Sequence, residues 1–273
     1  MQGELPMEKR FSELVEFTRQ MGLYAIEKQR GITRTTKADG SYVTATDLFI
    51  NESMINKIGE LYPEANIITE ENKDTPFDPK APLTFIIDPI DGTTAYSRGM
   101  QNWAVSVGIV DDKRKAVGAI VYLPRFGKIE DYSLFVREIN SPVVYLNGEP
   151  YQISLEGKNV VKDIIVNDRT WRNLEFPVNQ IKFRSLCSSV INMLCPVLFP
   201  DFAAAINDEG SYCWDVAGTA AILDAYGIKT IMSTGDENLF TDTYLEQRKP
   251  YPVPVYAATP KALEFMFKNF RLK

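Results

Sequence analysis

IIDPIDGTT, at residues 86–94, joins an apolar run to two closely spaced acids. The run is typical of a buried strand and ends at Asp88, and Asp91 follows three residues later, with Gly92 and two threonines behind it. Asp-Pro and Asp-Gly pairs both favour turns, so an ordinary loop would account for the same letters. The rest of the chain has to distinguish a turn from a site.

The composition predicts a soluble, acidic protein. The chain has 273 residues and is 45% hydrophobic, which is enough to bury a large core. Its net charge of −6 offers no basic surface to nucleic acid or to an anionic membrane. No apolar run approaches the ~20 residues needed to span a bilayer, and the first residues lack the apolar core of a signal peptide. We therefore expect a cytoplasmic protein that binds neither nucleic acid nor membrane.

Histidine is absent from the chain, and this narrows the possible chemistry. The absence excludes Ser-His-Asp and Cys-His nucleophile systems and imidazole-rich zinc sites. No GxxxxGK[ST] or GxGxxG motif occurs, and the three cysteines, Cys187, Cys195 and Cys213, have no metal-like spacing and are expected to be buried thiols. An enzyme with this sequence must use carboxylates, hydroxyls, lysine or a hard metal ion.

The apolar spacing predicts alternating helices and strands without an internal repeat. A helix is expected over residues 7–30 with Gly31 as its stop, and a second is expected to run to about residue 60 after a cap at Thr44 or Thr46. Strands are expected at NIIT, LTFIID, NWAVSVGIV and KAVGAIVYLP and near residues 151–154 and 163–167. Further helices are expected at SSVINMLCPVL, at WDVAGTAAILDAY and at TPKALEFMFKNF, the last capped by Thr259.

Acids recur where these apolar elements begin or end. The set comprises Asp47, Glu70, Glu71, Asp88, Asp91 and Asp215. Each acid alone has an ordinary explanation as a helix-terminal or solvated residue. If they converge, however, they repel one another unless a cation lies among them, and Mg²⁺ prefers such oxygen ligands while leaving positions open for water and a substrate phosphate.

The opening stretch fits such a site better than a turn. Pro89 removes a backbone donor and fixes the bend between Asp88 and Asp91, so that both acids can point at one spot. Gly92 permits close approach of a ligand, and the N–H groups of Gly92, Thr93 and Thr94 at a helix start suit a phosphate. Carboxylates for a metal next to amides for a phosphate predict a phosphate-ester site.

Four segments together resemble the inositol monophosphatase family of Mg²⁺-dependent, often lithium-sensitive sugar phosphatases. They are KADGSYVTATD, ITEEN, IIDPIDGTTAYSRG and GSYCWDVAGTAAILDAYG, which occur in family order between residues 37 and 227. The resemblance implies a phosphoric monoester hydrolase in which a metal-activated water attacks a small phosphomonoester in line.

The resemblance also implies a role for each matching residue. Glu70, Asp88 and the carbonyl of Ile90 would hold one metal ion, and Asp88, Asp91 and Asp215 a second, with Glu70 also near a third, weaker ion. Thr93, paired with Asp47, would orient the attacking water, and Gly92, Thr93 and Thr94 would hold the phosphate. The implied catalytic residues are Asp47, Glu70 and Thr93, and the implied substrate contacts are Asp91, Asp208 and Asp215. Trp214 is expected to pack rather than react.

The implied fold is a layered α-β-α-β-α sandwich, an α/β architecture with the active site between two halves. Residues 1–145 would form the first half, with most of the metal ligands, and residues 146–273 the second, with Asp215 and substrate contacts. Two or three Mg²⁺ ions are implied, with Mn²⁺ as a substitute and Ca²⁺ and Li⁺ as inhibitors, and a homodimer is possible. The chain departs from the family pattern at Gly227-Ile228 (usually Gly-Gly), at CSS near residue 187 (usually GSA) and at VVYLNG before residue 148, which affects the substrate rather than the reaction.

Several alternatives stay open at this point. A haloacid-dehalogenase-type phosphatase needs its two acids two residues apart, whereas these are three apart, and Phe240 stands where its later acid belongs. A catalytically inactive phosphate-binding protein is disfavoured by the complete set of acids. Within the family, a 3′(2′),5′-bisphosphate nucleotidase or a fructose-1,6-bisphosphatase remains possible beside an inositol monophosphatase. Asp208, seven residues before Asp215, favours the last, although a surface acid would explain it as well.

Overall fold

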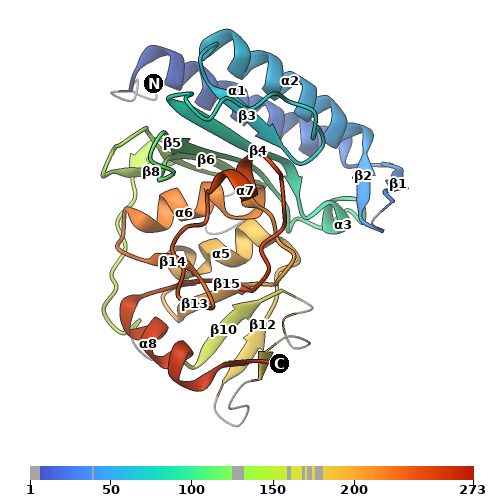
Figure 1. Ribbon diagram of the computed structural model, residues 1–273. Coiled ribbons are helices and arrows are strands. Elements are labelled where there is room, and N and C mark those ends of the chain that lie inside the picture. Colours follow the sequence, from blue (N-terminus) through green and yellow to red (C-terminus); the bar gives the residue numbers. More distant parts are fainter. Residues whose placement is uncertain are drawn as a thin grey trace.

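The chain folds into five stacked layers in the order helices, sheet, helices, sheet, helix (Figure 1). The computed structural model describes residues 7–38, 40–124, 132–158, 161–167, 170, 174–175 and 181–273. This arrangement confirms the α-β-α-β-α sandwich implied by the resemblance. The division into halves at residue 145 stays a prediction, and the first sheet itself includes residues up to Pro150.

The first sheet has seven strands in the order β3-β4-β5-β6-β7-β8-β9. Strands β3 and β4 are parallel, and every later pair is antiparallel. Their bounds are Asn66–Thr69 (β3), Leu83–Asp91 (β4), Ala104–Asp111 (β5), Ala116–Pro124 (β6), Tyr132–Arg137 (β7), Val144–Leu146 (β8) and Glu149–Pro150 (β9). Nearly every residue of β4, β5 and β6 is buried, because helices cover both faces of the sheet. Valine-rich strands without a polar face are the consequence.

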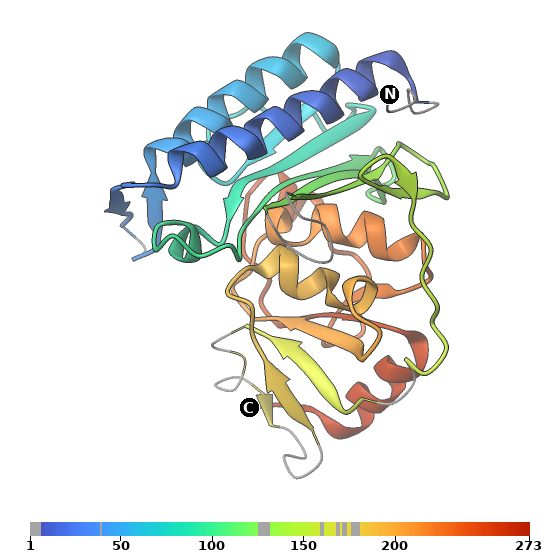
Figure 2. The same cartoon turned by 180° about the vertical axis from the view of Figure 1, so that it is seen from behind.

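Helices α1 (Lys9–Lys28) and α2 (Ala45–Leu61) form the outer layer on this sheet (Figure 2). Both match their predicted positions, and Gly31 follows α1 with a left-handed φ of 73°. Thr44 caps α2: its hydroxyl accepts from the Thr46 amide at 3.2 Å, while the Asp47 carboxylate accepts from the Thr44 amide at 3.0 Å. This reciprocal cap fixes the side chain of Asp47 at the start of the helix.

The second sheet has five strands in the order β12-β10-β13-β15-β14. Helix α8 (Pro260–Asn269), capped by Thr259 as predicted, lies on its outer side, and α5 (Ser189–Leu198) and α6 (Ala217–Asp224) lie between the two sheets (Figure 1). The strand bounds are Lys182–Arg184 (β12), Asp163–Val166 (β10), Phe202–Asn207 (β13), Val255–Ala258 (β15) and Lys229–Met232 (β14). The middle helices are apolar on most sides because both sheets bury them.

A close backbone contact seats α6 on the first sheet. A Cβ atom on Gly108 of β5 would lie 2.4 Å from the Cβ of Ala217, and a Cβ on Gly218 would lie 2.5 Å from the hydroxyl oxygen of Ser106. Backbone atoms leave room only for glycine at position 108, whereas a side chain at position 218 would have to displace the Ser106 hydroxyl. The turn before α6 is therefore held against β5, whose Ser106 is the register partner of Asp88 on β4.

The remaining elements are small. They are hairpin β1 (Arg34–Thr36) with β2 (Tyr42–Thr44), pair β11 (Leu174–Glu175) with β16 (Arg271–Leu272), α3 (Thr93–Tyr96), the 3₁₀ turn η1 (Cys213–Asp215) and α7 (Asp242–Leu245). The strand predicted near 151–154 is wrong, because this segment runs outside both sheets without ladder partners of its own. Cys187 is exposed, not buried as expected, whereas Cys195 and Cys213 are buried. Within the described residues, no helix is long and apolar enough to cross a membrane.

Candidate active site

A bulge in β4 brings Asp88 and Asp91 to one side of the first sheet. Asp88 pairs with Ser106 and Asp91 with Ala104, so three steps along β4 match two steps along β5. Residues three apart on a regular strand face opposite sides, and one extra residue restores the same side. Pro89 suits the bulge because it has no N–H to donate to the ladder. This is why two carboxylates stand so close together at the end of a buried strand.

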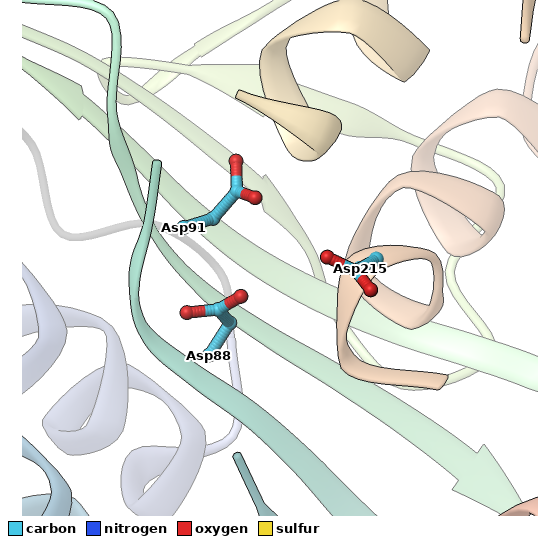
Figure 3. A group of neighbouring side chains, drawn as sticks. All are labelled: Asp88, Asp91 and Asp215. Atoms are coloured by element: carbon cyan, nitrogen blue, oxygen red, sulfur yellow. The ribbon is translucent and has the colours of Figure 1, made fainter. Parts of the chain in front are cut away.

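Asp215 completes a cluster of three aspartates. Its turn, η1, precedes α6, and the ligand oxygens of Asp88, Asp91 and Asp215 all lie within 4.8 Å of one another. In Figure 3 the carboxylates of Asp88 and Asp91, from one strand, and of Asp215, from the opposing turn, surround a common space. The structure therefore assembles three of the predicted metal ligands from segments more than 100 residues apart.

Burial and repulsion by neighbouring carboxylates raise the pKa of all three groups. The pKa of Asp88 lies well above its usual range, because the group is buried and faces the charges of Glu70, Asp91 and Asp215. Burial also raises the pKa of Asp91 to about 6, and burial with the nearby Asp91 raises that of Asp215 to about 8, although Asp215 is partly open to the cavity. Keeping these carboxylates charged therefore costs the folded protein electrostatic free energy, and a cation bound among them would remove that cost.

The three aspartates differ in their partners. Asp91 accepts hydrogen bonds from the amides of Ser189 (3.1 Å) and Val190 (2.9 Å) at the start of α5, and from the hydroxyl of Ser188. Asp215 accepts from the amide of Tyr212 at 2.6 Å. Oδ1 of Asp88 is fully buried and has no hydrogen-bond partner among the residues that the structure describes. An all-oxygen set with one unpartnered buried carboxylate oxygen fits a hard divalent cation.

Glu70 lies at the end of β3, beside this cluster. Its carboxylate pairs with the ammonium group of Lys37 at 3.0 Å, and Lys37 also pairs with Glu71 at 2.7 Å. The Glu71 side chain is only 5% exposed, and burial with the charge of Glu70 raises its pKa to about 7. Lys37 was not predicted as a site residue, although it opens one of the segments that carry the family resemblance. Its sequence context gives no sign of the two distant partners.

Thr93 and Asp47 meet as predicted. The Thr93 hydroxyl lies 3.1 Å from a carboxylate oxygen of Asp47 and 3.0 Å from the carbonyl oxygen of Ile90. Burial raises the pKa of Asp47 to about 6, although hydrogen bonds from Thr44 and Thr93 oppose the rise. A hydroxyl has one proton, so Thr93 donates to one of these oxygens at a time, and its lone pairs remain available to a donor in the cavity.

The segment after Asp91 lines the cavity with backbone and hydroxyl groups. Gly92 has φ 88°, and a Cβ there would lie 2.8 Å from the carbonyl oxygen of Asn102, so the position requires glycine. Thr93 and Thr94 open the short helix α3 directly behind it. The three residues predicted to hold a phosphate are thus together at the cavity wall.

One cavity of about 660 Å³ is lined by Glu70, by the three aspartates, by the Gly92, Thr93 and Thr94 segment and by Asp208. Asp208 follows β13 and is 7% exposed. Three cations also line the cavity: Lys37, Lys73 and Arg98. The ring of Tyr212 stacks on that of Trp214 at 4.5 Å, and Lys73 lies 5.6 Å from the Tyr212 ring, so Trp214 packs as expected.

Comparison with known proteins places the chain among phosphatases. A model of the inositol monophosphatase family matches residues 12–264. Inositol monophosphatase 1 of Bos taurus is 30% identical over 211 residues, which cover 71% of this chain and 72% of the bovine protein.

Two solved structures share the fold. A staphylococcal inositol monophosphatase-1 in a LiCl-soaked inhibitory complex has TM-score 0.75 and 16% identity and covers 96% of this chain and 97% of its own. An IMPase/NADP phosphatase complexed with Mg²⁺ and phosphate has TM-score 0.75 and 16% identity, with 95% and 94% coverage. The family match spans almost the whole sandwich and every acid of the cavity, and the chain therefore belongs to the inositol monophosphatase family and is a phosphomonoesterase.

Proposed function

We propose that this protein hydrolyses a small, inositol monophosphate-like phosphomonoester with the help of Mg²⁺. The observation that carries the proposal is the cluster of Asp88, Asp91 and Asp215, in which a buried oxygen of Asp88 has no partner among the described residues. Gly92, Thr93 and Thr94 line the same cavity. The bovine relative is an inositol monophosphatase, and one structure of the same fold holds Mg²⁺ and phosphate.

The cations would be held by Asp88, Asp91, Asp215, Glu70 and the carbonyl oxygen of Ile90. Divalent cations in this position would polarise the phosphoryl group and favour ionisation of the attacking water. Mg²⁺ is the proposed ion and Mn²⁺ its substitute, because the donors are all oxygens. Ca²⁺, with its longer and looser coordination, and Li⁺, by analogy with the LiCl-soaked staphylococcal complex, are proposed inhibitors.

Thr93 and Asp47 orient the nucleophile in this proposal. Asp47 is fixed by the cap at the start of α2 and faces the Thr93 hydroxyl at 3.1 Å. When the Thr93 proton points at Asp47, the threonine oxygen accepts a hydrogen bond from water in the cavity. Asp47 therefore controls the direction of the Thr93 hydroxyl, which orients the water towards a phosphate bound at Gly92, Thr93 and Thr94.

The rest of the cavity fits a compact polyol. Asp208 also lines the cavity, where its carboxylate would accept hydrogen bonds from substrate hydroxyls. Asp91 and Asp215 are proposed to contact the substrate hydroxyls nearest the reacting phosphate. A volume of about 660 Å³ exceeds that of a phosphate ion and leaves room for a ring that carries several hydroxyls.

The proposal is tested by phosphate release from a panel of substrates: inositol 1-phosphate, other sugar monophosphates, fructose 1,6-bisphosphate and a 3′,5′-bisphosphate nucleotide. Hydrolysis that needs Mg²⁺, stops with excess chelator and is fastest with a monophosphorylated polyol is expected. A clear preference for either bisphosphate would replace the proposed substrate class but keep the reaction. Full activity in chelator, or no hydrolysis of any ester with Mg²⁺, would refute the reaction itself.

A further inference from the structure

The start of α5 surrounds the carboxylate of Asp91 with hydrogen-bond donors. The backbone amide of Ser189 donates to Oδ1 at 3.1 Å. Oδ2 accepts two hydrogen bonds, one from the backbone amide of Val190 at 2.9 Å and one from the side-chain hydroxyl of Ser188. Three donors from one helix start therefore hold one carboxylate of the cation cluster.

These hydrogen bonds limit what Asp91 can offer to a cation. An ionised carboxylate has about four lone-pair positions, two on each oxygen. Both positions of Oδ2 are occupied, whereas the contacts of the described residues fill only one of the two positions on Oδ1. A cation in the cluster can therefore bind Oδ1 of Asp91 but not both oxygens of this carboxylate.

The Ser188 hydroxyl is held in this position from the helix side. Ser188 is the N-cap of α5, and its oxygen accepts from the backbone amide of Ile191 at 3.0 Å. An amide N–H can only donate, so the hydroxyl proton is left for Asp91. Ser188 is 2% exposed, and a Cβ on Gly92 would lie 3.3 Å from the Cβ of Ser188. The serine is thus packed against the residue that directly follows Asp91.

The far end of α5 is anchored as well. Lys158 is buried, and its ammonium group donates to the carbonyl oxygens of Pro196 and Phe199, where the helix ends. A cation at the carboxyl end of a helix and a carboxylate at its amino end both interact favourably with the helix dipole. The helix start is therefore a fixed support for Asp91.

We propose that Ser188 is a positioning residue that sets the ion preference of the cation site, because its hydroxyl occupies Oδ2 of Asp91 and restricts this carboxylate to one ligand oxygen. Mg²⁺ requires a near-ideal octahedron, whereas Ca²⁺ takes about six to eight oxygens and can bind a carboxylate through both of its oxygens. A carboxylate with one available oxygen suits Mg²⁺ and denies Ca²⁺ a ligand. The inference rests on the proposed function in one respect, namely that these carboxylates bind a divalent cation.

The experiment measures the dissociation constants of Mg²⁺ and Ca²⁺ by calorimetric titration without substrate, and its readout is the ratio of the two constants. Ser188→Ala removes the hydroxyl and frees one lone pair of Oδ2. Mg²⁺ then loses an oriented ligand while Ca²⁺ gains a second oxygen, so the ratio should shift towards Ca²⁺ by roughly tenfold or more. Ser188→Thr keeps a hydroxyl and should leave the ratio within a few-fold of the wild type.

Two further variants separate this effect from the loss of a helix cap. Ser188→Gly also lacks the hydroxyl, but glycine caps a helix almost as well as serine does. It should shift the ratio as Ser188→Ala does, and it decides the question if Ser188→Ala does not fold. Thr259→Ala removes the side-chain cap of α8, at a residue that does not line the cavity, and should leave both dissociation constants unchanged.

A purely structural role of Ser188 would affect the two ions alike. A wild-type ratio in Ser188→Ala and Ser188→Gly, with both ions bound as before or both bound more weakly, would therefore overturn the inference. An equal shift of the ratio in Thr259→Ala would overturn it too. A wild-type protein that binds neither ion would refute the proposed function instead, which separates the two failures.

Discussion

Replacing Asp88 by asparagine should make the metal-free protein more stable and remove its response to Mg²⁺. Asp88 is 2% exposed, has an unpartnered oxygen within the described residues and faces the charges of Glu70, Asp91 and Asp215. An asparagine side chain has almost the same shape as an aspartate side chain but carries no charge. The substitution therefore separates the electrostatic cost of the cluster from its packing.

The expected magnitude follows from the neighbouring Asp91. Its pKa is raised from 3.8 to about 6 even though three hydrogen bonds favour its charged form. A rise of this size in the pKa of a carboxyl group corresponds to ~3 kcal/mol of lost stability when the group is charged. Asp88 has fewer compensating bonds, so removing its charge should raise the metal-free free energy of unfolding by about 3 kcal/mol at pH 8. For a chain of this size that is a rise in Tm of roughly 6–12 °C.

The sign of the pH dependence is part of the prediction. A carboxyl group with a raised pKa in the folded state binds more protons than in the unfolded state, so stability is lost as the pH rises from about 4 through the folded value. Because the pKa of Asp91 is about 6 and that of Asp215 is about 8, the Tm of the wild type in chelator should fall between pH 5 and pH 8. The advantage of Asp88→Asn should accordingly be largest at pH 8 and small at pH 5.

The assay is thermal unfolding followed by circular dichroism, in excess chelator and in Mg²⁺, at pH 5, 6.5 and 8. Mg²⁺ should raise the Tm of the wild type, since the cation binds the folded cluster only, and should barely move that of Asp88→Asn. Asp112→Asn, in the exposed turn after β5, is the matched control and should change neither value. If Asp88→Asn unfolds at or below the wild-type Tm in chelator at pH 8, or still responds fully to Mg²⁺, the account of the cluster is wrong.

Three further outcomes are expected. Thr93→Ala and Asp47→Asn should each lower kcat strongly with little change in KM, and the double variant should be scarcely worse than either, because the two residues act as a unit; multiplying losses in steady-state kinetics would contradict this. Ca²⁺ added at constant Mg²⁺ should inhibit phosphate release. An initial-rate titration that shows no inhibition would argue against a site that requires the short ligand distances of Mg²⁺. Asp208→Asn should raise KM for a polyol phosphate more than it lowers kcat, whereas an unchanged KM would place Asp208 outside substrate recognition.

The convergence of the acids could be predicted from the sequence more easily than the contacts around them. The convergence of Asp88 and Asp91 followed from Pro89 and the end of an apolar run, both of which are local features, and the β4 bulge is their structural form. The cap of α2 is also a local feature, since Thr44 and Asp47, which form it, lie within four residues of sequence. Such short-range determinants are readable without a structure.

Long-range partners were not predictable. Ser188 contacts Asp91 across 97 positions of sequence, and Lys37 reaches Glu70 and Glu71 across 33 and 34. Serines before a helix indicate a cap, which Ser188 indeed provides, but nothing local names the carboxylate that the same hydroxyl binds. The false strand near 151–154 has a similar cause, because its alternating residues pack against the middle layer without a neighbouring edge strand.

The close contact of Gly108 and Gly218 between β5 and α6 fixes the distance from the sheet to the turn that carries Asp215. A Cβ on Gly108 would meet the Cβ and the backbone of Ala217, and a Cβ on Gly218 would meet the hydroxyl of Ser106, so the segment that follows Asp215 packs against the sheet with no room for another side chain. The spacing across the three carboxylates is then set by the scaffold, not by the occupant. Discrimination between a small ion, with ligands at about 2.1 Å, and a larger one, at about 2.4 Å, then depends on how α6 packs on β5, a contact that includes no ligand oxygen. A methyl group added at Gly218 would push α6 away from β5, increase the spacing of the three carboxylates and shift the preference of the site towards the larger ion.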